Sequence, residues 1–177
     1  GAAFLCSVPP SGNGPMTKRF IATRPLASLK IVTGFVAKLA CIWPGLAREL
    51  FFGESLKDES SDVLDRYMGH FRRDSSVGLD IKALAKSLPS LQRGPSGVAS
   101  WYTVNQNRPN VLVLGARDDF LVDEEGIAET ATFFDCDYSM LPSTPHDLML
   151  GDTWEAAAGA VERWLGSLDS TQAEGLH

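Results

Sequence analysis

The chain has 177 residues, 44% of them hydrophobic and 21% charged, which is the composition of a folded globular protein of about one domain rather than of a disordered one. Twenty-two acidic residues outnumber 16 lysines and arginines, for a formal net charge of −6, and the densest basic stretches are two residues long. This balance argues against a nucleic-acid-binding protein. No run approaches the ~20 apolar residues of a transmembrane helix, so we expect no membrane-spanning segment.

The chain begins with a short apolar segment. Residues 2–8 (AAFLCSV) are followed by a run of turn-forming residues at 9–15 (PPSGNGP). A short apolar run bounded by turn residues predicts a buried strand. We therefore expect this strand to have neighbours on both sides.

Helices alone are predicted for the long middle of the chain, about residues 15–105. A first helix ends at Pro44, a short one covers 44–52, another begins at Ser60 or Ser61, and a fourth covers 76–88. Their apolar positions recur at spacings of three and four. These positions are Leu29, Val32, Phe35, Val36, Leu39 and Trp43, then Val63, Leu64, Tyr67, Met68 and Phe71, then Leu79, Ile81, Leu84 and Leu88.

The last third of the chain alternates between strand and helix patterns. Residues 111–115 (VLVLG) predict a central parallel strand, 124–134 a helix and 138–142 a weaker strand. A final helix is predicted from Asp152, because the sequence DTWE has the form of a capping box. Its expected apolar face is Trp154, Ala158, Val161 and Leu165, its expected stop is Gly166, and we expect fraying after Asp169.

These patterns predict an α/β fold with a parallel sheet and a helical insertion. We divide the chain into a core strand at 1–14, a helical cap at 15–105, a C-terminal α/β core at 106–169 and a frayed tail at 170–177. Three parallel strands buried on both faces make an unusual complete domain. We therefore expect the chain to be the C-terminal part of a longer protein.

Two loops follow predicted strands at the edge where α/β proteins place their catalytic groups. In the first, GARDDFLVD, Asp118 or Asp119 could orient an imidazole, although either could simply cap the turn and the next helix. In the second, STPHDLML, His146 follows the last strand, although it could be a solvated or capping histidine. A carboxylate followed by a histidine matches the later part of the order nucleophile, acid, histidine.

At this point the sequence resembles the α/β-hydrolase superfamily. VLVLGARDDFLVDEEG is similar to the acid-bearing strand and turn, STPHDLML with TWEAAAGAVERWL to the histidine loop and last helix, and AAFLCSVPPSG to the strand after the nucleophile helix. Residues 15–105 resemble the helical cap. The resemblance implies a carboxyl-ester hydrolase of lipase or lysophospholipase type, many of them from plants, that needs no metal or organic cofactor.

Carried over by position, the resemblance makes His146 the general base and Asp119 the triad acid, with Asp118 as the alternative. Asp119 is preferred because DFLV fits the family pattern of an Asp, one residue and then Ile or Leu before Val. The Gly-x-Ser-x-Gly nucleophile elbow and the glycine-rich oxyanion loop are absent, and Ser96 in GPSGV does not supply the elbow. We expect both to lie upstream of Gly1, so the chain alone should be inactive.

Several alternatives remain open. An aspartate nucleophile would make the protein an epoxide hydrolase or dehalogenase, and loss of the triad would leave a binding protein on the same fold. We expect a small hydrophobic or acyl-ester substrate, in a pocket formed by apolar side chains of the cap. The candidates are Phe35, Leu39, Trp43, Phe51, Phe52, Met68 and Phe71.

The cysteines give a weak indication of cellular environment. Cys6, Cys41 and Cys136 are odd in number and too far apart for a zinc-ligand spacing or a disulfide framework, so we interpret them as buried thiols. They favour a reducing compartment such as the cytosol or a plastid, and any targeting segment would lie upstream. The sequence leaves the oligomeric state open.

Overall fold

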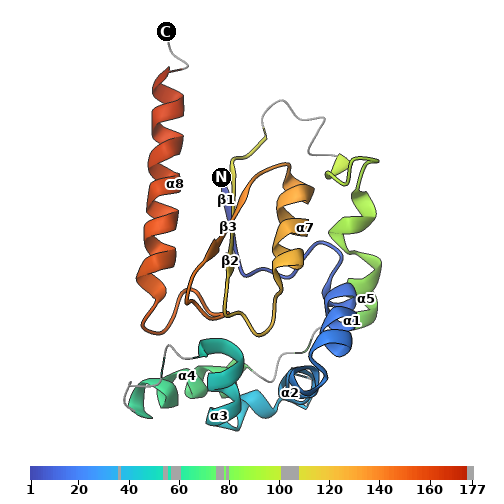
Figure 1. The fold of residues 1–177 in the computed structure, drawn as a ribbon, viewed down its shortest axis with the longest axis vertical. Coiled ribbons are helices and arrows are strands. Elements are labelled where there is room, and N and C mark those ends of the chain that lie inside the picture. Colours follow the sequence, from blue (N-terminus) through green and yellow to red (C-terminus); the bar gives the residue numbers. More distant parts are fainter. Residues whose placement is uncertain are drawn as a thin grey trace.

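The computed structural model describes all residues except 36, 54–55, 57–60, 75–77, 79, 101–107 and 175–177. It is an α/β fold with a parallel sheet of three strands and, within the described residues, seven α-helices. The strands are β1 (Ala2–Leu5), β2 (Val111–Ala116) and β3 (Tyr138–Leu141), in the order β1-β2-β3. Helices α7 (Glu124–Phe134) and α8 (Trp154–Glu174) cover opposite faces of the sheet (Figure 1).

The central strand, β2, is buried on both faces, as its continuous apolar sequence predicts. Val113 belongs to the apolar cluster on the α7 side, while Leu114 and Ala116 belong to the cluster on the α8 side. Gly115 allows α7 and β3 to approach closely, because a Cβ there would lie 2.4 Å from Met140 Sδ and 2.8 Å from Ile127 Cγ1. This close packing fixes α7 against the sheet.

The first strand differs from expectation in length. It ends at Leu5 rather than at residue 8, because Cys6 has a φ of +44° and turns the chain out of the sheet. Within the described residues it pairs with β2 alone, from Ala2↔Val111 to Leu5↔Leu114. Among the described residues this apolar strand therefore has one neighbour, and the second neighbour that we expect stays a prediction.

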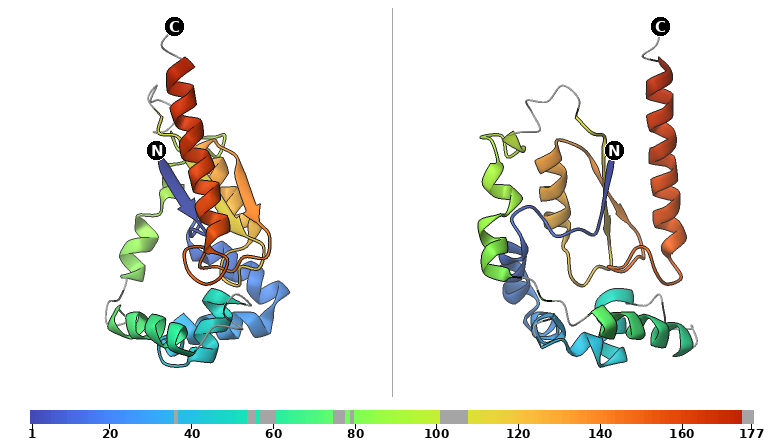
Figure 2. Two further views of the ribbon diagram at one scale, coloured as in Figure 1. Left: turned by 90° about the vertical axis from the view of Figure 1, so that its left-hand side faces the viewer. Right: turned by 180° about the vertical axis from the view of Figure 1, so that it is seen from behind.

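The segment between β1 and β2 is helical in its described part, as predicted, apart from one isolated bridge between Arg93 and Ala99. Helices α2, α3 and α4 lie beyond the carboxyl ends of the strands, and α1 and α5 lie on the α7 side (Figures 1 and 2). The elements are α1 (Asn13–Thr23), α2 (Pro25–Phe35), the 3-10 helix η1 (Leu39–Cys41), α3 (Pro44–Ala47), the π-helix η2 (Arg48–Phe52), α4 (Ser61–Asp74), α5 (Ile81–Lys86) and the 3-10 helix η3 (Pro89–Gln92). None of the described helices is long and apolar enough to cross a membrane.

The first predicted helix of this segment is wrong in its extent. Helix α2 ends at Phe35, and Lys38 has a φ of +54°, so the chain breaks well before Pro44, which instead begins α3. The physical reason lies in residues 31–34 (IVTG), three β-branched residues followed by glycine, which have low helix propensity. The predicted helix 76–88 is shortened to α5, and residues 76, 77 and 79 lie outside the described residues.

Helix α8 differs from expectation at both ends and in its buried face. It begins at Trp154 and continues past Gly166 to Glu174. Trp154 and Leu165, predicted to face the core, are about half exposed (50% and 49%), whereas Ala157 is buried. Ala160 and Val161 pack beside Ala157 against the sheet, so the buried face is turned relative to the predicted one.

Candidate functional site

Two loops meet at the carboxyl edge of the sheet, one after β2 and one after β3. The backbone N–H of Arg117 donates to the carbonyl of Leu141 at 2.9 Å, and that of Asp118 donates to the carbonyl of Thr144 at 3.1 Å. Thr144 is buried, and its hydroxyl donates to the Leu141 carbonyl at 2.9 Å. These bonds hold the loop that carries His146 against the loop that carries the two aspartates.

The loops bring Asp119 and His146 together. Nδ1 of His146 lies 2.9 Å from Oδ2 and 3.1 Å from Oδ1 of Asp119. The Asp119 side chain is 1% exposed, and its Oδ1 also accepts the backbone N–H groups of Leu121 at 2.7 Å and Val122 at 2.9 Å. The carboxylate is therefore fixed in the turn after β2, where it can hold the imidazole in one orientation and one tautomer.

The neighbouring aspartate does not take part in this pair. Asp118 is exposed, and its backbone N–H bonds to the carbonyl of Thr144 rather than to His146. Of the two carboxylates that the sequence left open, the structure thus places Asp119 against His146. The His146 side chain remains 23% exposed, and among the described residues its ring hydrogen-bonds to Asp119 alone. Nε2 therefore stays available to exchange a proton with another group.

Cys6 is a third member of this cluster, which sequence reasoning treated only as a core thiol. Its sulfur and one ligand atom each of Asp119 and His146 all lie within 4.8 Å of one another. Burial raises the pKa of the Cys6 thiol strongly, and the charge of Asp119 and a hydrogen bond to its carboxylate raise it further. A thiol kept protonated in this way donates a hydrogen bond to Asp119 and is a poor nucleophile. The sequence signal that could have placed it here is its position directly after a strand.

The π-helix η2, which belongs to the helical segment between β1 and β2, contacts the loop that carries His146. The backbone N–H of Asp147 donates to the carbonyl of Phe51 at 3.0 Å, and the Phe51 ring centroid lies 6.2 Å from that of His146. Burial raises the pKa of the Asp147 carboxyl, against the opposing effect of the Met149 and Leu150 backbone N–H groups and of His146. The helical segment between β1 and β2 and the loop that carries His146 are thus joined next to the imidazole.

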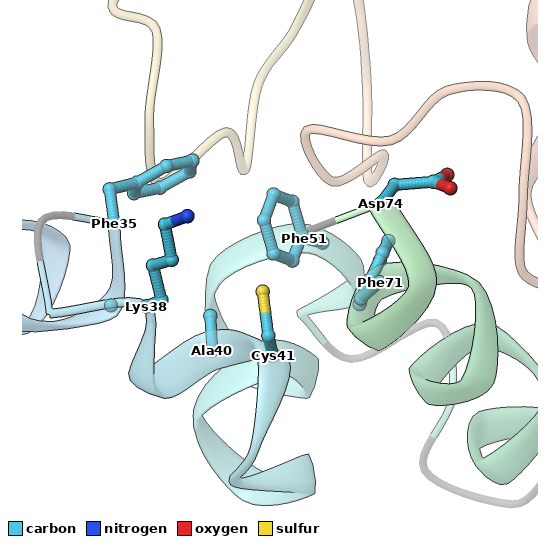
Figure 3. Close-up of a pocket in the computed structure, with 8 residues that line it drawn as sticks. Phe35, Lys38, Ala40, Cys41, Phe51, Phe71 and Asp74 are labelled. Atoms are coloured by element: carbon cyan, nitrogen blue, oxygen red, sulfur yellow. The ribbon is translucent and has the colours of Figure 1, made fainter. Parts of the chain in front are cut away.

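An apolar cavity of about 220 Å³ is lined in part by Phe51. The side chains of Phe35, Lys38, Cys41 and Phe51 converge on it (Figure 3). Its remaining lining residues are Gly34, Ala40, Phe71 and Asp74. Of the predicted pocket residues, only Phe35, Phe51 and Phe71 line this space.

The other predicted pocket residues have different surroundings. Phe52 and Met68 are fully buried and form a core cluster with Leu56, and Trp43 is 57% exposed. Leu39 is partly buried in η1 and does not line the cavity. These four do not line the cavity beside Phe51, because periodicity marks a helix face as apolar without showing what that face packs against.

Two other residues that the sequence singled out lie away from the Asp119–His146 pair. Ser96 is exposed in the turn between Arg93 and Ala99, and Ala99 is bonded to the Phe133 carbonyl at the C-terminal end of α7. The site is at the opposite end of α7, so Ser96 is not its nucleophile. Among the cysteines, Cys6 is buried as predicted, whereas Cys41 and Cys136 are partly exposed, and all three are free thiols.

The donor set of the cluster also bears on metal binding. A thiol, a carboxylate and an imidazole within 4.8 Å could ligate zinc. However, Asp119 already accepts two backbone N–H groups and the imidazole bond. The arrangement therefore fits a hydrogen-bonded acid–base pair better than a metal centre.

Comparisons of the chain with models of protein families, with curated proteins and with solved structures find no match.

Proposed function

We propose that this chain carries the acid and the base of a hydrolytic triad of the α/β-hydrolase type, acting on carboxyl esters of lipase or lysophospholipase kind. The observation that supports this proposal is the hydrogen bond between buried Asp119 and Nδ1 of His146 at the carboxyl edge of a parallel sheet. In such a site the histidine takes a proton from the nucleophile, and the carboxylate stabilises the imidazolium that forms.

The nucleophile in this proposal is a serine on a segment that the chain does not contain. The catalytic cycle is acyl transfer to that serine, followed by hydrolysis of the acyl-enzyme by a water that His146 deprotonates. The apolar cavity beside Phe51 supports an apolar acyl group, since it adjoins the ring that packs near His146.

The test uses both the 177-residue chain and the longest polypeptide that the gene encodes around it. We expect the short chain to hydrolyse p-nitrophenyl esters at no more than the rate of a denatured control. We expect the long form to turn over the ester and to react with a fluorophosphonate probe. His146→Ala should abolish both, while His70→Ala, which alters an exposed histidine of α4, should change neither.

Other results would contradict the proposal. Turnover that survives His146→Ala would remove His146 from the mechanism. A long form that does not react with the fluorophosphonate probe but hydrolyses epoxides or releases halide from haloalkanes would indicate an aspartate nucleophile. A long form that binds apolar esters without turnover would indicate a binding protein.

A further inference from the structure

The charges of this chain are divided very unevenly along its length. The first 48 residues contain six lysines and arginines and no acidic residue, for a formal charge of +6. The rest of the chain contains ten basic and 22 acidic residues, for a formal charge of −12. Helices α1 and α2 therefore form a basic part of a molecule that is acidic overall.

The same segment exposes an unusual amount of apolar side chain. Seven of the 14 large hydrophobic residues that are exposed in the described structure fall between residues 21 and 43. On α2, Leu26 is 78% and Leu29 62% exposed, while Ser28 and Gly34 on the opposite side are buried. Near η1 and α3, Ile42 is 58% and Trp43 57% exposed.

Exposed cations are interleaved with these apolar side chains. Lys18, Arg24, Lys30 and Lys38 are all exposed. Lys30 pairs with Glu49 at 2.5 Å, with both side chains nearly half exposed, whereas Arg19 turns away to Asp123 and Glu125 on the α7 side. We call this surface, formed by residues 18–35 and 37–43 without the inward-facing side chains, the basic apolar face.

We propose that the basic apolar face docks on a bilayer that contains anionic phospholipids. Helices that lie in the membrane interface combine exposed Leu, Phe and Trp with Lys and Arg, which are attracted to anionic headgroups. Residues 1–48 contain no acidic residue, so this face is complementary in charge to an anionic surface. A second copy of this chain, with a net charge of −6, would offer acidic side chains only outside its own first 48 residues. Phe35 and Lys38 of this face also line the apolar cavity, so the cavity adjoins the docking surface. The inference does not depend on the proposed hydrolysis.

The test is sedimentation of the 177-residue chain with vesicles. One set contains phosphatidylcholine alone and the other phosphatidylcholine mixed with phosphatidylglycerol. We expect binding to the anionic vesicles only, weakening as sodium chloride is raised, because salt screens exposed charges. Lys18→Gln and Arg24→Gln should each lower the vesicle affinity about fivefold.

Apolar substitutions separate lipid insertion from simple charge attraction. Leu26→Ser with Leu29→Ser should reduce vesicle binding on the order of tenfold or more. The matched control is Leu84→Ser with Leu91→Ser, which removes two other exposed leucines (46% and 66%) from elsewhere in the helical segment and should leave binding unchanged. Circular dichroism verifies that each variant is folded.

Four results would overturn the proposal. One is a folded chain that binds neither kind of vesicle, and another is vesicle binding that is unchanged in Lys18→Gln, in Arg24→Gln and in Leu26→Ser with Leu29→Ser. The third is a concentration-dependent dimer, in light scattering, that Leu26→Ser with Leu29→Ser abolishes while vesicle binding is absent. If a longer form of the protein fails to bind vesicles that the 177-residue chain binds, the face is covered by the protein's own chain and the proposal also fails.

Discussion

Asp119 shows how much the position of a single carboxylate is decided by backbone donors. Its Oδ1 accepts the N–H groups of Leu121 and Val122, which fixes the side chain before the imidazole is considered. Asp118, one residue earlier, is exposed. The sequence pattern preferred Asp119 over Asp118 from family resemblance, but only the turn geometry gives a physical reason why one of two adjacent aspartates meets the histidine.

The first prediction concerns these two aspartates in the active long form of the protein. Asp119→Asn should lower kcat by on the order of 10³–10⁴-fold, because an amide no longer stabilises the imidazolium or selects the tautomer. Asp118→Asn is the matched control and should retain activity. Steady-state kinetics on a chromogenic ester measure both. Equal losses in the two variants would show that neither carboxylate has the assigned role.

The second prediction concerns the reactivity of Cys6. Burial and the adjacent Asp119 raise its thiol pKa, so the thiolate that reacts with alkylating agents is suppressed in the folded chain. We expect iodoacetamide at pH 8 to modify Cys41 first and Cys6 only after denaturation. Peptide mass spectrometry identifies the modified residues. Rapid modification of Cys6 in the native chain would mean that its sulfur is an accessible nucleophile and not a donor to Asp119.

Helix α7 depends on close contacts that its sequence does not reveal. Its periodicity predicted residues 124–134 correctly, and the strand before it was also predicted correctly within one residue. The role of Gly115 was not predictable, because it depends on Met140 and Ile127 approaching from two other elements. Likewise, the buried face of α8 depends on how that helix lies on the sheet, which its own spacing does not determine.

The third prediction compares two glycines. Gly115→Ala should lower the free energy of unfolding by about 1–3 kcal/mol, because the new methyl would overlap the Met140 sulfur and Ile127. Gly166→Ala places a methyl in open space on α8 and should raise stability by up to about 1 kcal/mol. Urea denaturation measures both values. A stable Gly115→Ala variant would show that α7 does not pack as closely as described.

The fourth prediction concerns the N-terminus of α7, which Asp123 caps by accepting the Gly126 N–H at 2.9 Å. Burial acts to raise the pKa of the Asp123 carboxyl, but the Arg19 hydrogen bond, the Gly126 N–H and the charge of Arg19 together hold that pKa below its usual value. The stability that this carboxylate contributes is therefore present at neutral pH, above the unfolded pKa of about 3.9, and is lost as pH falls through the lower folded value.

Accordingly, Asp123→Ala should destabilise the chain by about 1–3 kcal/mol at pH 7, and this difference from the wild type should shrink in acid below pH ~4. Thermal unfolding at both pH values measures it. Asp74→Ala, which breaks a fully exposed pair with Arg73, should leave the midpoint unchanged. A difference that grows in acid would contradict the assigned sign.

At the scale of the whole molecule, the sheet is open at β1. The sequence predicted a strand buried on both sides, and the structure confirms the strand but gives it one neighbour among the described residues. Which strand lies at an edge is a property of the pairing of all strands, and a single segment contains no information about it. The backbone N–H groups of Ala2 and Cys6 donate to β2, so by alternation those of Ala3 and Leu5 point outward.

The fifth prediction is that this edge is open in solution. Hydrogen exchange should be fast at Ala3 and Leu5 and slow at Phe4 and at the central amides of β2. Resolved amide exchange by nuclear magnetic resonance distinguishes these positions. Strong protection at Ala3 and Leu5 would show that another strand covers the edge, whether from a second copy or from additional chain.

The π-helical turn of η2 has a consequence for how this protein tolerates insertions and deletions. The bond from Gly53 N–H to the Arg48 carbonyl spans five residues and adds one residue to the turn. As a result Phe52 is buried in the core cluster while Phe51 faces the cavity and His146. Deletion of one residue from 48–52 would restore an ordinary α-turn and rotate the following side chains by about 100°. Either Phe52 would then leave the core cluster or Phe51 would leave the cavity and His146. We therefore expect a change in the length of this turn to be tolerated less well than substitution of most residues in it.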